Sequence, residues 1–115
     1  MLRILLDNRL AQLGDSFVNF LYSLALTRRY NRPVGRRVSD KALAEAARLA
    51  DVRQLLPKRT RRGDVANSIE ALLVHVWLNR LMTIDEMTSI LQAIEPDSKA
   101  FAEVTRKALQ KLNRE

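Results

Sequence analysis

One stretch of this chain fits only at the centre of a helical fold. Residues 65–81 read VANSIEALLVHVWLNRL, and their apolar side chains point to nearly every side of a predicted helix. A helix that is apolar all round has to be enclosed by other elements. We therefore expect a long central helix from Val65 to about Leu81, with Trp77 in the core and the rest of the chain packed around it.

The segments on both sides of this stretch have helical periodicity as well. No long run alternates with period two, and three prolines and three glycines separate the segments. We expect further helices over residues 4–29, from 39 to no further than 56, over 83–94 and over 98–113. The predicted helix N-caps are Ser39, Asp64, Thr83 (with Glu86 at capping-box spacing), and Asp97 or Ser98. The sequence thus predicts an all-α domain of about five helices.

The length and composition fit one domain. The chain has 115 residues, of which 47% are hydrophobic, and it has no cysteine; this length supports a single modest core. The longest strongly apolar run, residues 17–26, is shorter than the roughly 20 residues that span a bilayer. Asp7 comes too early for a signal peptide. We expect a single soluble, cytoplasmic domain over residues 1–115, with no membrane partner.

Positive charge is concentrated in three segments. The formal net charge is +7, the pI is about 10.6, and the basic segments are RRYNRPVGRR (28–37), KRTRR (58–62) and RKALQKLNRE (106–115). Arginine forks suit phosphates, and several clusters in one small domain favour a nucleic-acid partner over a merely solvated surface. The candidate phosphate contacts are Lys58, Arg59, Arg61, Arg62, Arg36 and Arg37.

Two carboxylates occur on helices that should be largely buried. Asp15 follows Gly14 within the apolar stretch LAQLGDSFVNFLYSL (10–24), and Glu70 lies in the predicted central helix. A buried carboxylate is rare unless it is paired or bound to a metal. Either Asp15 is a rim residue paired with an arginine, or the two acids converge to hold Mg²⁺ against a phosphate. Asn67, on the same helical face as Glu70, can offer an amide oxygen to the metal or a hydrogen bond to a water ligand.

Three blocks of the sequence, in order, resemble the ribonuclease III family. RLAQLGDSFVNFLYSLAL (9–26) is similar to the family's signature helix, and VSDKALAEAARLADVRQLL (38–56) to the segment that follows it. DVANSIEALLVHVWLN (64–79) resembles its second acidic helix. The resemblance covers about residues 8–94. It implies an all-α endonuclease domain that hydrolyses double-stranded RNA with Mg²⁺, leaves a 5′-phosphate and a 3′-hydroxyl, and works as a homodimer.

The resemblance also implies roles for individual residues. Asp15 and Glu70 would be the catalytic carboxylates and, with Asn67, the metal ligands. The signature helix would pack across the two-fold axis of the dimer, with interface residues Leu10, Leu13, Gly14 and Phe17. Without a side chain, Gly14 would then allow two helix backbones to approach closely.

The family's set of acids is incomplete in this chain. Ala11 and Asn67 stand where the family has carboxylates, Asn8 stands at its first signature acid, and a further acid has no counterpart in the short connection 28–37. The compact mini-ribonuclease III branch also has a reduced set and no double-stranded RNA-binding domain, and we expect none here. Because hard cations want anionic oxygen ligands, we expect a preference for Mn²⁺ or high Mg²⁺, or no catalysis.

Two other classes of function remain open. A catalytically silent member of the same fold, which binds double-stranded RNA or a ribosome, would explain the missing acids. A small helical DNA-binding regulator would explain the alanine spacing in SDKALAEAARLADVRQLL (39–56). That segment, however, lacks a glycine turn, and its possible recognition helix stops at Pro57 and is too short.

Overall fold

Helices account for all the regular structure in residues 1–114, which are the residues that the computed structural model describes. The elements are α1 (Leu2–Leu5), α2 (Asn8–Tyr30), α3 (Asp40–Leu49), the short 3-10 turn η1 (Arg53–Leu55), α4 (Arg62–Leu78), α5 (Ile84–Ala93) and α6 (Asp97–Asn113). No strand occurs in this part of the chain. The predicted all-α class is confirmed.

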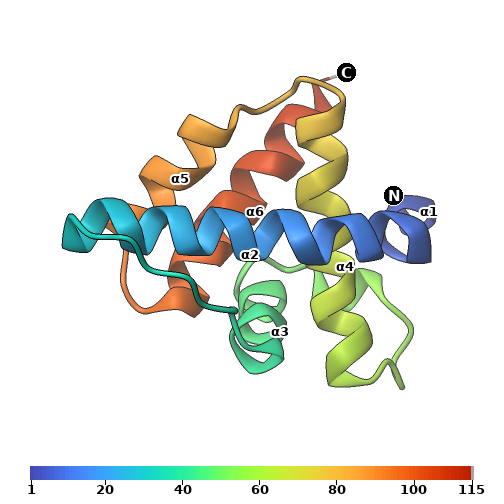
Figure 1. Ribbon diagram of the computed structural model, residues 1–115. Helices are drawn as coiled ribbons and strands as arrows, with labels where there is room; N and C mark the ends of the chain where they lie inside the picture. The colour runs from blue at the N-terminus through green and yellow to red at the C-terminus, as the bar shows by residue number, and fades with distance from the viewer. Residues whose placement is uncertain (115) are drawn as a thin grey trace.

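The central helix is α4. It contacts α1, α2, α3 and α6, and α2 crosses it at a steep angle (Figure 1). The run from Ala71 to Val74 is completely buried, so neighbours enclose the middle of this helix on all sides, as the apolar pattern predicts. Trp77 is wrong as a core residue, because it lies near the end of α4, where 36% of it is exposed.

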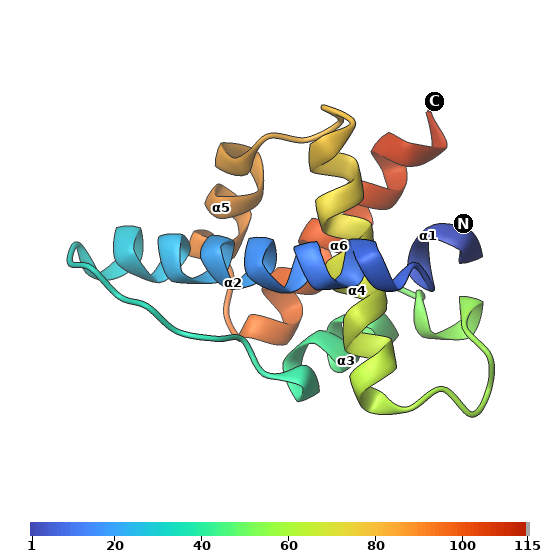
Figure 2. The same ribbon diagram turned by 45° about the vertical axis from the view of Figure 1, so that its right-hand side comes forward.

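The second half of α2 is covered by other elements. α5 packs on α2 and on α6 (Figure 2). The Tyr22 hydroxyl of α2 donates to Asp97 at the start of α6, with an O–O distance of 2.8 Å. Burial, followed by the hydrogen bond to Asp97, raises the pKa of Tyr22 to about 12. No helix in residues 1–114 is both long enough and apolar enough to cross a membrane.

The helix expected over residues 4–29 is two helices. Asp7 separates α1 from α2 with an extended backbone, and its carboxylate accepts hydrogen bonds from the backbone N–H groups of Arg9 and Leu10 at 2.9 and 3.0 Å. Asp7 is therefore an N-cap. The break is hidden in the sequence because apolar residues continue at helical spacing on both sides of it.

Two of the predicted caps are confirmed. The Ser39 hydroxyl accepts from the backbone N–H of Ala42 at 3.0 Å at the start of α3. Thr83 and Glu86 form the reciprocal capping box at the start of α5. Both follow patterns in which a short polar side chain satisfies N–H groups that the first turn leaves free.

The other two predicted caps are wrong. The N-cap of α4 is Arg61, so Asp64 lies inside the first turn, where a negative charge still favours the helix through its dipole. The N-cap of α6 is Pro96, which has no side-chain hydrogen bond to offer. Asp97 accepts from Tyr22 instead of capping its own helix.

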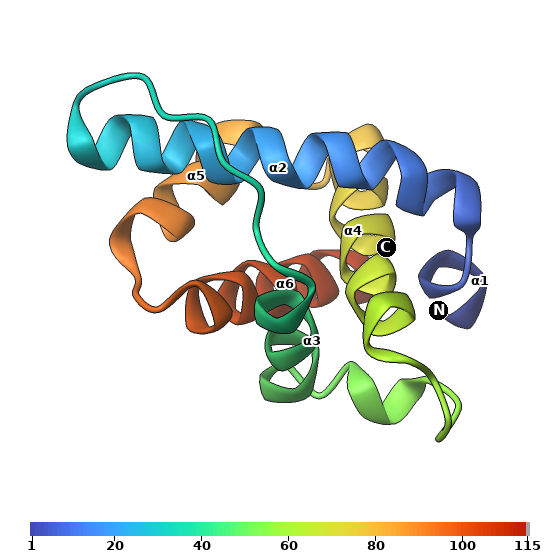
Figure 3. The same ribbon diagram turned by 60° about the horizontal axis from the view of Figure 1, so that its bottom comes forward.

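An extended segment connects α2 to α3 and follows one face of α2 (Figure 3). Three polar side chains of α2, spaced four residues apart, bind the backbone of every second residue of the segment. Thr27 binds Val34, Ser23 binds Arg36, and Asn19 binds Val38. Four helical residues rise about 6 Å and two extended residues span nearly the same distance, so the two patterns stay in register. We call this set the polar ladder.

The backbones of α2 and α4 touch at Gly14. A Cβ atom placed on Gly14 would lie 2.2 Å from the carbonyl oxygen of Glu70 and 2.5 Å from its carbonyl carbon. Only glycine fits this contact. The close approach of two helices is therefore present, but the partner of Gly14 is α4 of the same chain. The expectation that Gly14 lies between two copies of the chain is wrong, because Gly14 is already buried within one copy.

We predict that Gly14→Ala destabilises the fold, because the new methyl group must push α2 and α4 apart. The expected loss is at least about 1–3 kcal/mol in the free energy of unfolding, measured by urea denaturation. Gly35→Ala is the matched control, because nothing lies within 4 Å of its added Cβ, and it should change stability by less than about 1 kcal/mol. Equal stability of the two variants would contradict the packing argument.

Candidate functional site

Asp15 and Glu70 meet where α2 crosses α4. Asp15 follows Gly14, whose contact with Glu70 fixes the crossing, and the two carboxyl groups lie within hydrogen-bonding reach of each other. They line an open cavity of about 590 Å³, which we call the acidic cavity. Its other lining residues are Asn8, Ala11, Gln12, Arg37, Asp40 and Asn67. The structure thus brings the two acids together as expected, while their chemical role stays a prediction.

Glu70 is a buried acid in a negatively charged environment. Only 4% of the residue is exposed. Burial, then the hydrogen bond and charge of Asp15, and then the charge of Asp40 raise the pKa of Glu70 to about 8, against a smaller lowering by Arg37. At neutral pH, Glu70 therefore holds a proton next to Asp15. The cavity is short of positive charge.

Asp15 lies at the rim of the cavity and is paired. Its Oδ1 atom accepts from Arg37 Nη2 at 2.9 Å and from Asn19 Nδ2 at 3.2 Å, and 43% of its side chain is exposed. The alternative of a rim residue paired with an arginine therefore describes this structure. It does not exclude metal binding, because an exposed ion pair is weak.

Asn67 contacts Glu70 as a hydrogen-bond donor. With its amide nitrogen facing the acid, Asn67 donates to Glu70 Oε1 at 3.2 Å and to the carbonyl oxygen of Gly63 at 3.3 Å. In this orientation it does not present its amide oxygen to a cation beside Glu70. The hydrogen bond holds the Glu70 carboxyl group in one orientation, and metal binding by Asn67 stays a prediction.

Asp40 and Asn19 are site residues that the sequence pattern did not indicate. Asp40 is the first residue of α3, lines the acidic cavity and raises the pKa of Glu70. It directly follows the cap Ser39, so it looks like a first-turn acid that serves only its own helix. Asn19 lies one helical turn after Asp15, and this spacing of four residues could have predicted their contact.

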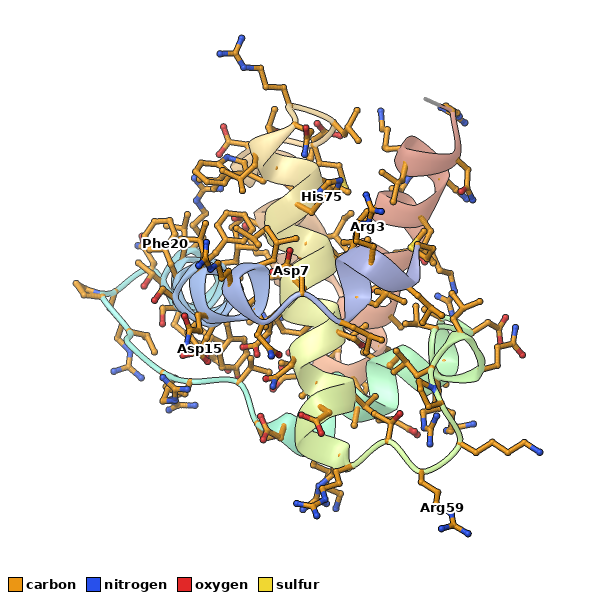
Figure 4. All side chains as sticks on the ribbon, turned by 90° about the vertical axis from the view of Figure 1, so that its right-hand side faces the viewer. Arg3, Asp7, Asp15, Phe20, Arg59 and His75 are labelled. Atoms are coloured by element: carbon orange, nitrogen blue, oxygen red, sulfur yellow. The ribbon has the colours of Figure 1, made fainter. Side chains whose placement is uncertain are left out.

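The six predicted phosphate contacts do not form one cluster. Arg37 lies in the acidic cavity. Arg59 and Arg61 line an adjoining cavity of about 360 Å³, which shares Asn8, Ala11 and Asn67 with it, and Figure 4 shows Arg59 on the far loop, well away from Asp15. Arg62 and Lys58 line two grooves beside α3 and η1, and Arg36 is exposed with its backbone bound to Ser23.

The donors that are present fit one weakly held divalent cation. No group of three or more Asp, Glu, His or Cys in residues 1–114 converges closely enough to hold a metal. Asp40 also lines the cavity, and Asp15 and Glu70 are the two carboxyl groups that lie against each other. Mg²⁺ is commonly bound by one or two carboxylates together with waters and substrate phosphates. Burial raises the pKa of Glu70 most, and the neighbouring acids Asp15 and Asp40 raise it further; a cation in the cavity would offset the repulsion among these acids.

The chain matches a known protein family. The family model described as "Ribonuclease III" matches residues 8–114. This range begins at the first residue of α2 and includes every residue that lines the acidic cavity. No curated protein matches the chain.

We predict that Glu70 makes metal-free protein less stable as the pH rises. The folded chain holds the Glu70 proton with a pKa of about 8 instead of 4.5, so the contribution is most favourable below the lower value and is lost as the pH passes the upper one. In EDTA, Glu70→Gln should therefore gain stability relative to the wild type between about pH 5 and pH 9, measured by urea denaturation. Glu95→Gln, at an exposed acid, is the control. A parallel pH dependence of wild type and Glu70→Gln would contradict the prediction.

Proposed function

The chain belongs to the ribonuclease III family, and we propose that it is a metal-dependent endoribonuclease that hydrolyses phosphodiester bonds of double-stranded RNA. The observation that carries the proposal is the convergence of Asp15 and Glu70 in an open cavity where α2 crosses α4. The adjoining cavity with Arg59 and Arg61 supports it, because positive charge at a distance from the carboxylates can hold neighbouring phosphates of the RNA backbone.

Asp15 and Glu70 are the residues that would hold Mg²⁺ or Mn²⁺. When bound, the cation supplies positive charge to the phosphate and lowers the pKa of the attacking water. Asn67 keeps the Glu70 carboxylate in place through its hydrogen bond. Glu70 has to lose its proton before it can act as an anionic ligand, since its pKa is about 8 in the metal-free protein.

The reaction proposed for this cavity is a hydrolysis. Water attacks phosphorus, the bond from phosphorus to the 3′ oxygen breaks, and the products carry a 5′-phosphate and a 3′-hydroxyl. Arg59 and Arg61 bind phosphates that flank the one under attack, because a guanidinium fork matches the phosphate oxygens. An RNA duplex is recognised mostly through its shape and backbone, so a reading helix is not required.

The exposed apolar face of α2 supports a homodimer. Leu13 and Phe20 lie seven residues apart on this helix and are 47% and 53% exposed. Phe17, between them, stacks on Trp77 of α4 with ring centroids 4.9 Å apart, and Leu10 is half-buried beside it. Figure 4, which looks almost along α2, shows Phe20 and Asp15 on opposite sides of the helix. A second copy on this face would therefore leave the acidic cavity open.

We predict that Leu13→Glu converts the dimer into a monomer, because a charge in an apolar interface cannot be paired there. Light scattering coupled to gel filtration measures the molar mass. Leu55→Glu is the matched control, because Leu55 is a similarly exposed leucine of η1, at 41%. A monomeric wild type would contradict the homodimer. The same molar mass for both variants would show that Leu13 of α2 does not lie in the dimer interface.

We predict that Asp15→Asn and Glu70→Gln each reduce cleavage of a labelled RNA duplex by at least about 100-fold, because each removes a ligand of the cation. Wild-type cleavage should be faster in Mn²⁺ than in Mg²⁺ at equal concentration. Asp85→Asn and Glu95→Gln change exposed acids outside the cavity, so they should cut like the wild type.

Two results would replace the proposal. An absence of cleavage in either metal, with retained binding of the duplex, would indicate a catalytically silent member of the fold. The missing carboxylates at Ala11 and Asn67 are what favour that alternative. Tighter binding to a DNA duplex than to an RNA duplex would indicate a small helical DNA-binding regulator.

A further inference from the structure

The polar ladder positions one arginine, Arg37, at the acidic cavity. Asn19 accepts from the backbone N–H of Val38 at 2.8 Å, and Ser23 binds the backbone of Arg36 through both its N–H and its carbonyl group. Arg37 lies between these two anchored residues. Asp15 is the next position on the ladder face of α2, four residues before Asn19. The backbone of Arg37 is therefore held beside the turn of α2 between Asn19 and Ser23, and from there its side chain reaches Asp15.

The Arg37 side chain is bound to the carboxylate that would ligate a metal. Arg37 Nη2 lies 2.9 Å from Asp15 Oδ1. It is the one cation among the lining residues of the acidic cavity, where it faces Asp15, Asp40 and Glu70. A divalent cation on Asp15 would repel this guanidinium, because both positive charges would share one small site.

The contact between Arg37 and Asp15 is easy to break. The Arg37 side chain is 73% exposed and the Asp15 side chain 43% exposed. Ion pairs this exposed contribute little to stability, so a divalent cation with twice the charge competes well for the carboxylate. The backbone anchors of the polar ladder do not involve the guanidinium, so the side chain can turn away while its Cα atom stays in place.

We propose that Arg37 is the resident cation of the acidic cavity: it competes with the divalent metal for Asp15 in the free protein, and after its displacement it binds an RNA phosphate. This inference rests on the proposed metal site and adds a regulatory residue to it. The displaced guanidinium remains tethered at the cavity mouth, where its charge and fork geometry suit a phosphate. Metal binding thus converts Arg37 from a partner of the protein into a partner of the RNA.

Mn²⁺ binding without RNA tests the first half of the inference. The full-length wild type, Arg37→Gln and Arg36→Gln are titrated with Mn²⁺, and free Mn²⁺ is followed by electron paramagnetic resonance. Arg36→Gln is the matched control, because it removes one charge from the same exposed segment but from outside the acidic cavity. Arg37→Gln should bind Mn²⁺ about three- to tenfold more tightly than Arg36→Gln. Thermal unfolding verifies that both variants fold.

Duplex binding tests the second half. Affinity for an RNA duplex is measured in EDTA and in saturating Ca²⁺, an oxygen-seeking cation. In EDTA, Arg37 is occupied by Asp15, so Arg37→Gln and Arg36→Gln should weaken binding equally. In Ca²⁺, Arg37→Gln should be the weaker binder by several-fold and should lower the salt dependence by about one counterion. A ratio between the variants that is the same in both conditions would overturn the phosphate role.

The outcomes separate this inference from the proposed function. If the wild type binds Mn²⁺, Asp15→Asn does not, and the two arginine variants have equal affinities, then the metal site stands and the role of Arg37 is wrong. If none of the proteins binds Mn²⁺, both proposals fail. If only Arg37→Gln binds Mn²⁺, Arg37 blocks the site in the wild type and the competition is established.

Discussion

The contact between the backbones of α2 and α4 at Gly14 is the constraint on which the rest of the structure depends. A side chain at this position would overlap the carbonyl group of Glu70, so glycine alone allows the two helices to cross at this distance. The crossing encloses α4, as its apolar surface requires. It also places Asp15, the residue after Gly14, beside Glu70. One glycine thus sets both the packing of the core and the position of the candidate site.

The burial of Glu70 has an electrostatic consequence that links the fold to its function. Packing against α2 leaves only 4% of Glu70 exposed, and burying an ionised carboxylate without a partner is unfavourable. The protein meets this cost with a proton on Glu70, with the amide of Asn67 and with the guanidinium of Arg37 nearby. None of these is a strong, permanent counter-charge. The folded site is therefore stabilised without a cation, and the proposed metal would replace contacts that are individually weak.

The sequence predicted the features that are set by local periodicity and by side chains with one dominant use. Examples are the buried helix α4, the cap Ser39 and the capping box of Thr83. The proximity of Asp15 and Glu70 follows as well, once both of their helices are assigned as central. The sequence missed what depends on three-dimensional neighbours. Asp7 begins a new helix by capping α2, although the apolar period continues across it. Trp77 is 36% exposed while its neighbour Val76 is fully buried, so the last turn of α4 is covered on one side and partly open on the side of Trp77.

The polar ladder explains how an incomplete set of acids can still make a coherent site. Ala11 and Asn67 leave the acidic cavity with fewer negative charges than the family resemblance implies, and Asn67 donates a hydrogen bond where an acid would add repulsion. With fewer acids, a single arginine goes far toward balancing the charge of the cavity without a metal, and the ladder positions Arg37 for that purpose. The loss of acids and the presence of Arg37 are therefore two parts of one charge balance. Restoring an acid at position 67 would place a third carboxylate against Glu70 and make the cavity depend on a bound cation.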